Sequence, residues 1–163
     1  MRGWTLSLVV LASILLIGAM ACGPLPQTRA EFAIFGEAGR DAIVKETRIV
    51  QHPFERLVEL MTDRTQRCLN IGFTLDGSPV SYRSTFEAQG EGRAELTVQR
   101  YTTGYAQQIP EGGPFVFTAD LRSLGGGQIS VVTHRYRYKA HQGLNATIDR
   151  WLQGEAVGCP EMP

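Results

Sequence analysis

An excess of charge of either sign is the first thing this sequence lacks, because 16 Lys and Arg residues balance 16 Asp and Glu residues. Such a chain has no global field that would draw it onto nucleic acid or an anionic surface. Common catalytic signatures are missing too: there is no Gly-x-Ser-x-Gly, no His-Glu-x-x-His and no phosphate-binding loop. The three histidines, His52, His134 and His141, are not spaced like metal ligands. We therefore expect a protein that is not an enzyme and that binds no metal, cofactor or nucleic acid.

Long apolar runs are equally scarce, and the conspicuous one lies near residue 1. Residues 6–17 (LSLVVLASILLI) follow the basic Arg2, and small residues surround Ala21 after the run. No acidic residue occurs before Glu31. A basic start, an apolar segment and a small-x-small end are the parts of a secretory signal peptide. The sequence therefore predicts a signal peptide over residues 1–21.

The stretch Ala19-Met20-Ala21-Cys22 resembles the lipobox of bacterial lipoproteins, although Ala19 stands where that family usually has leucine. The resemblance implies cleavage after Ala21 and a diacylglycerol on the Cys22 thiol, which would attach the protein to a membrane of the bacterial cell envelope. Gly23, in place of aspartate, implies the outer membrane, with the domain facing the periplasm. Two alternatives are an ordinary signal-peptidase site that releases the protein and an uncleaved membrane span.

Cysteine is rare, and its odd number needs an explanation. The chain has three cysteines, Cys22, Cys68 and Cys159. Lipid on Cys22 would leave Cys68 and Cys159 as a pair in an oxidising compartment. We therefore predict a structural disulfide between them. A reactive thiol or a metal ligand is the alternative, but no Cys-x-x-Cys and no nearby histidine supports it.

Behind the signal peptide, the sequence predicts a lipid-anchored tether over residues 22–39 and a single domain over residues 40–163. Residues 41–51 are rich in β-branched side chains, which is typical of a strand. Residues 53–68 begin with proline and then repeat apolar side chains at helical spacing, which predicts a helix with one buried face.

Short strands and a second helix complete the predicted domain. Asp76-Gly77 is a strong hairpin signal. Strands are expected over residues 69–75, 80–88, 94–101, 115–121 and 128–139, and a helix over residues 144–153. The order strand, helix, strands, helix predicts an α+β fold: an antiparallel meander sheet of five or six strands with two helices on one face. This order resembles helix-grip and related lipid-binding layouts.

One strand interleaves cations and aromatic rings. Arg135 and Arg137 would share one face of it, and Tyr136 and Tyr138 the other. This pattern is a candidate contact for an anion or a glycan, with arginines for the charge and tyrosines for stacking. The alternative is a strand whose tyrosines face the helices and whose arginines face water. The long loop over residues 103–114 is a second candidate site, because such loops are often functional.

Three classes of function follow from these observations. The first, which we favour, is a membrane-anchored, non-enzymatic interaction module that binds an envelope protein or a cell-wall component. The second is a carrier that holds a hydrophobic small ligand in a cavity between sheet and helices. The third is an enzyme whose site is assembled from residues distant in sequence. A sheet–helix interface filled by Phe54, Met61, Phe86, Phe117 and Trp151 would argue against the carrier.

Overall fold

The computed structural model describes residues 25–39, 42–104 and 108–161, and it has the predicted α+β class. A short 3-10 turn, Lys139–His141, precedes the last helix. The helices and strands, in chain order, are α2 (Arg29–Glu37), β1 (Ile43–Gln51), α3 (Phe54–Cys68), β2 (Ile71–Leu75), β3 (Ser78–Ala88), β4 (Arg93–Thr102), β5 (Phe115–Gly125), β6 (Gln128–Tyr136) and α4 (Gln142–Leu152).

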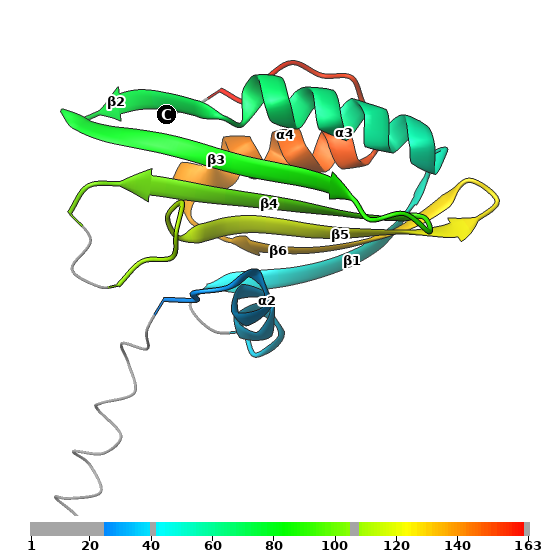
Figure 1. The fold of residues 1–163 in the computed structure, drawn as a ribbon, viewed down its shortest axis with the longest axis horizontal. Helices are drawn as coiled ribbons and strands as arrows, with labels where there is room; N and C mark the ends of the chain where they lie inside the picture. The colour runs from blue at the N-terminus through cyan, green and yellow to red at the C-terminus, as the bar shows by residue number, and fades with distance from the viewer. Residues whose placement is uncertain (1–24, 40–41, 105–107, 162–163) are drawn as a thin grey trace, which may run out of the picture.

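The six strands form one antiparallel sheet in the order β1-β6-β5-β4-β3-β2 (Figure 1). Strands β2 to β6 are joined as a meander, and β1 pairs with β6 at the end of the sheet. The tight turn between β2 and β3 is made by Asp76 and Gly77, both with positive φ (49° and 78°). Two such residues give the turn that matches the twist of a hairpin, so the Asp-Gly prediction is confirmed.

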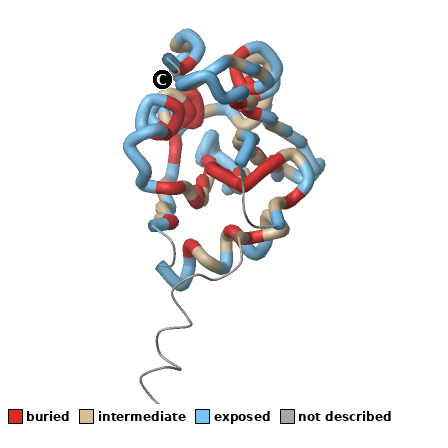
Figure 2. Tube along the Cα trace, turned by 90° about the vertical axis from the view of Figure 1, so that its left-hand side faces the viewer, coloured by how far each residue is buried: buried red, intermediate tan, exposed pale blue. Residues whose placement is uncertain are grey.

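Helices α3 and α4 cover one face of the sheet, which we call the inner face. The hydrophobic core lies between these helices and the sheet (Figure 2). The buried side chains of α3 recur at helical spacing, as predicted: Leu57, Met61, Thr65 and Cys68. Those of α4 are Leu144, Asn145, Ile148, Trp151 and Leu152. Alternate residues of the central strands complete this core, since period-two alternation turns every second side chain inward. Among them are Leu96, Val98, Phe117 and Val131, each with no exposed surface.

Helix α2 was not predicted, and it lies on the opposite, outer face of the sheet (Figure 1). Phe32 is fully buried there, with its ring 5.4 Å from that of Tyr136. Gly36 brings the helix close to the sheet, because a Cβ at this position would lie 2.6 Å from His134 Cδ2. The folded domain thus begins near residue 29, inside the segment 22–39 that was predicted to be a tether.

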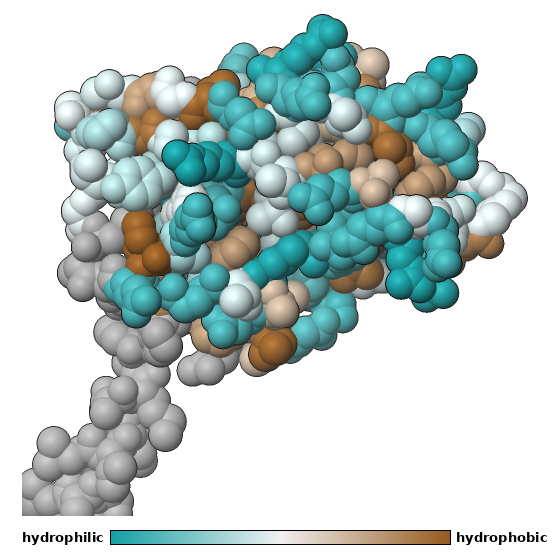
Figure 3. Space-filling model, in the orientation of Figure 1, coloured by the Kyte–Doolittle hydropathy of each residue, from teal (hydrophilic) through white to brown (hydrophobic). Residues whose placement is uncertain are grey.

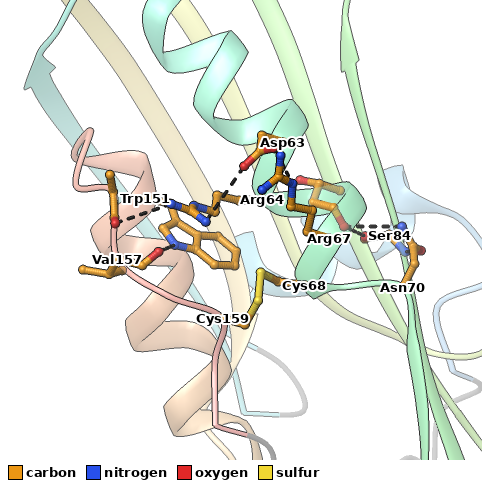
Figure 4. Close-up of a disulfide and its surroundings, with 11 residues drawn as sticks. Asp63, Arg64, Arg67, Cys68, Asn70, Ser84, Trp151, Val157 and Cys159 are labelled. Atoms are coloured by element: carbon orange, nitrogen blue, oxygen red, sulfur yellow. Dashed lines mark hydrogen bonds and ion pairs between the residues drawn. A yellow bond between two sulfur atoms is a disulfide. The ribbon is translucent and has the colours of Figure 1, made fainter.

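The predicted disulfide between Cys68 and Cys159 is present, with Cα atoms 5.1 Å apart (Figure 4). It joins the last residue of α3 to the segment that follows α4. Trp151 fastens this same segment, since its indole Nε1 donates a hydrogen bond to the carbonyl oxygen of Val157 at 3.1 Å. The chain after α4 therefore forms a strap that runs back along α3, from Gly154 beside His52 to the disulfide. The two helices are thus antiparallel, and the end of α3 does not meet the end of α4.

Candidate functional site

The two arginines predicted to contact a ligand lie on the inner face beside α4. Arg135 is already paired, because its guanidinium contacts both Asp149 of α4 and Glu46 of β1. Arg48 reaches the other oxygen of Asp149 at 2.9 Å. This network of half-buried charges holds α4 against β1 and β6. Arg135 thus has a structural role, whereas Arg137 is exposed on the rim of the same region.

The two predicted tyrosines point away from that network, as strand alternation requires. Tyr136 is buried against Phe32 of α2, and the ring of Tyr138 stacks on it with centroids 5.1 Å apart. Arg135, Tyr136 and Arg137 all line a cleft between β6 and α4, whereas Tyr138 is not part of that lining, so the structure does not bring the four together as one site. Whether any of them contacts a ligand stays a prediction.

A cleft of about 470 Å³ lies between β6 and α4, next to the predicted arginines. Asn145 forms part of it, and its side-chain amide donates a hydrogen bond to the Tyr136 carbonyl oxygen at 3.0 Å. Asp149, which also lines the cleft, is engaged by Arg48 and Arg135. Arg135, Asp149 and the side-chain amide nitrogen of Asn145 are therefore committed to joining the helix to the sheet.

A larger open groove of about 680 Å³ lies on the outer face, and we call it the outer-face groove. Its floor is made by β3 and β4, whose outward side chains stand opposite one another in the ladder: Arg83 faces Gln99, and Thr85 faces Thr97. Over the strands in Figure 3, hydrophilic and intermediate side chains predominate and hydrophobic ones form separate small areas. Its lining includes Asn70, Ile71, Ser81, Arg83, Ser84, Thr85, Thr97, Gln99, Glu111 and Gly112.

The long loop that was predicted as a candidate site forms one wall of this groove. Gln99 holds the wall in place, because its side-chain amide donates hydrogen bonds to the carbonyl oxygens of Glu111 at 2.7 Å and Gly113 at 2.8 Å. Gly113 has φ +101°, and a Cβ there would lie 2.6 Å from the Arg100 carbonyl oxygen. Such close approach requires glycine, so the sequence builds this wall tightly onto β4.

Tyr101 extends the groove along β4. It lies directly opposite Ser81 in the β3–β4 ladder and two residues from Gln99, so all three side chains share the outer face. Tyr101 is 41% exposed, an unusual exposure for so large a ring. Ser81 lines both the groove and a smaller adjoining hollow that contains Tyr101.

Two histidines are buried, and each has a lowered pKa. Burial lowers the pKa of His141 to about 4, and the nearby positive charge of Arg100 adds to the effect. Its Nδ1 lies 3.3 Å from the Tyr82 hydroxyl. Burial beneath α2 also lowers the pKa of His134, opposed by the Glu37 carboxylate. Neither histidine lines the outer-face groove or the cleft beside α4, and the described residues hold no cluster of three or more potential metal ligands.

No known protein family and no curated protein matches this sequence. Solved structures give only distant similarity. That of Ara h 8.0201 is 17% identical with a TM-score of 0.39, covering 69% of this chain and 95% of that one. The hypothetical protein jhp0584 from Helicobacter pylori is 12% identical with a TM-score of 0.39, covering 70% and 85%. The ZhuI aromatase/cyclase from Streptomyces sp. R1128 is 17% identical with a TM-score of 0.28, covering 70% and 92%. Similarity this distant carries no argument about function.

The predicted lipidation site, Cys22, lies outside the described residues, as does the whole predicted signal peptide. Among the described helices, none is long and apolar enough to cross a membrane. The described chain begins at Leu25, and Gln27 contacts the groove wall, because its side-chain amide donates a hydrogen bond to the Gln108 carbonyl oxygen at 3.1 Å. Gln27 therefore lies beside the loop that forms the wall of the outer-face groove.

Proposed function

We propose that this protein is a lipid-anchored envelope protein whose domain binds an envelope or cell-wall component without catalysing a reaction. The observation that carries the proposal is the outer-face groove, which is open, polar and walled by a loop fixed to β4. A groove of this size is within the range of ligand sites in proteins. Its side chains offer hydrogen bonds. Among the described residues that line it, no nucleophile forms a hydrogen bond with a general base.

The position of the proposed anchor supports this function. Three residue steps separate Cys22 from Leu25, and an extended chain covers at most about 11 Å over that distance. Lipid on Cys22 would therefore keep the domain against the membrane. The hydrogen bond from Gln27 to the loop would keep the groove on the side from which the anchor leaves. We propose the outer membrane, with the groove in the periplasm.

A carrier for a hydrophobic ligand is the second candidate, because two helices cover one face of the sheet. Met61, Phe117 and Trp151 have no exposed surface, and Phe54 and Phe86 are partly buried against the same core. A carrier would therefore have to move side chains apart to admit its ligand. Titration with an apolar fluorescent dye tests this, since a dye that enters the core without unfolding the domain would favour the carrier.

The experiment that tests the proposal uses full-length protein extracted gently from its own membrane. Intact mass spectrometry should show acyl chains on Cys22 and a mass two hydrogens lower for the disulfide. The same preparation should sediment with purified peptidoglycan sacculi or yield a stoichiometric envelope protein after crosslinking in cells. An unmodified Cys22 would refute the anchor. Lipidated protein that neither sediments with sacculi nor crosslinks to any protein would refute the interaction module.

A further inference from the structure

We propose that the outer-face groove binds a neutral, hydroxyl-rich carbohydrate, with a sugar ring packed on Tyr101. This inference rests on the proposed function and names the chemical class of the ligand. It differs from the anion or glycan contact that the sequence predicts at Arg135–Tyr138, because the groove residues come from β3, β4 and the loop wall.

The aromatic part of the site is Tyr101. Its ring stands on the outer face, opposite Ser81, in the hollow that adjoins the groove. A ring that is 41% exposed offers an apolar face with a polar hydroxyl at its edge. One side of a sugar ring has the matching character, because its C–H groups form an apolar patch bordered by hydroxyls. An extended chain of sugars could follow β4 from Tyr101 towards Thr97.

The polar part of the site lies along the groove floor and wall. Arg83 is exposed and makes no ion pair with any described residue, so its donors are available to ligand hydroxyls. Thr85 and Thr97 add hydroxyl groups that both donate and accept, and Glu111 on the wall adds acceptors. Each sugar hydroxyl needs donors and acceptors at once, and this set supplies both.

The charge of the groove favours a neutral ligand. Arg83 and Glu111 are the charged residues that line it, and their charges cancel. Because the attraction of Arg83 and the repulsion of Glu111 offset each other, the groove gives a phosphate or a polyanion no net electrostatic advantage over a neutral sugar. An apolar ligand is equally poorly matched, because the outward side chains of the floor are Ser81, Arg83, Thr85, Thr97 and Gln99.

Two sources could supply this chemistry, the glycan strands of the cell wall and the sugar headgroup of a glycolipid. The test is isothermal titration of detergent-solubilised full-length protein with tri-N-acetylchitotriose in one arm and with the neutral disaccharide headgroup of a diglycosyl diacylglycerol in the other. We expect binding in at least one arm. The arm that binds identifies the source.

Variants then locate the site. Tyr101→Ala should weaken binding by about tenfold or more, whereas Tyr101→Phe should bind nearly as well as the natural protein, because the ring is retained. Arg83→Ala should weaken binding by about tenfold through lost hydrogen bonds. Tyr138→Ala is the matched control, since Tyr138 is similarly exposed (53%) but belongs to the other predicted site. Thermal unfolding of each variant verifies that it is folded.

The outcomes separate this inference from the proposed function. Loss of binding with Tyr101→Ala but not with Tyr138→Ala supports the groove. The opposite pattern would overturn the groove assignment and move the site to β6. If the protein sediments with sacculi or crosslinks to an envelope protein, yet binds neither oligosaccharide, the carbohydrate inference fails and the proposed function stands. If it binds no envelope component at all, both fail.

Discussion

Removing the disulfide is the perturbation whose magnitude the structure defines most directly. Cys68 and Cys159 are 91 residues apart in sequence, so their bond closes most of the domain into one loop. In the chain-entropy description, a loop of that length restricts the unfolded chain by about 4.5 kcal/mol at 25 °C. The double substitution Cys68→Ala and Cys159→Ala should lower the free energy of unfolding by about this amount. For a domain of this size the melting temperature should fall by about 15 °C.

The assay is urea denaturation followed by the fluorescence of Trp151, which is fully buried beside the strap that the disulfide holds. The natural protein should be compared with and without reductant, and the double variant should be insensitive to reductant. Cys22→Ala is the matched control, because it replaces the third cysteine, the proposed lipid site, without touching the bond. A loss below about 1 kcal/mol would refute the reasoning, since it would mean that the unfolded chain is already constrained or that the closed loop is strained.

Further predictions concern the groove wall, the outer-face helix, the charge network and pH. Gly113→Ala should detach the wall from β4, lower stability by about 1–3 kcal/mol and abolish binding in the groove, as thermal unfolding and titration would detect. Phe32→Ala should lower the free energy of unfolding by about 3 kcal/mol, and α2 should be the first element to detach from the sheet. Rapid amide hydrogen exchange confined to that helix would show this. Asp149→Asn should lower the free energy of unfolding by about 2 kcal/mol, a value between those of surface and buried ion pairs. High salt should reduce the difference in unfolding free energy between this variant and the natural protein. Burial lowers the pKa of His141 to about 4, so the neutral form is favoured in the folded state. The contribution of His141 to stability should be full above about pH 6.5 and should fall by up to about 3 kcal/mol as the pH drops to 4. Urea titrations at several pH values should show a flatter stability profile for His141→Asn.

Much of the fold could be predicted because its signals are local. The β-branched run of β1, the one-sided apolar spacing of α3 and the Asp76-Gly77 turn each lie within a few residues. The pairing of Cys68 with Cys159 followed from counting cysteines. Helix α2 also has a local signal in the sequence. Thr28 accepts a hydrogen bond from the Glu31 backbone amide at 3.1 Å, and the Glu31 carboxylate accepts one from the Gln27 amide. A threonine followed three residues later by glutamate is a common helix start.

The predicted binding strand shows what local patterns cannot tell. The alternation over residues 135–138 correctly placed Arg135 and Tyr136 on two faces of a strand, but β6 ends at Tyr136, so Arg137 and Tyr138 lie beyond it. It could not show that Asp149, one helix later, and Glu46, from the first strand, would both reach Arg135. A half-buried guanidinium needs such partners, and only the tertiary fold supplies them. The sequence thus identified a strand that carries arginines and tyrosines. It did not reveal that Arg135 serves to join that strand to α4 and β1.

The outer-face groove could not be predicted from the sequence, because register creates it. Each member is an ordinary residue in its own segment: a serine and an arginine in β3, a glutamine and a tyrosine in β4, a glutamate in the loop. They become neighbours since Ser81 pairs with Tyr101 and Arg83 with Gln99, and since Gln99 also ties the loop to the strand. A slip of one residue in the β3–β4 pairing would turn these side chains into the core and expose Val80 and Tyr82. The burial of Val80 and Tyr82 against the core therefore fixes the groove on the other face. The packing that stabilises the domain and the arrangement that we propose binds carbohydrate are set by the same register.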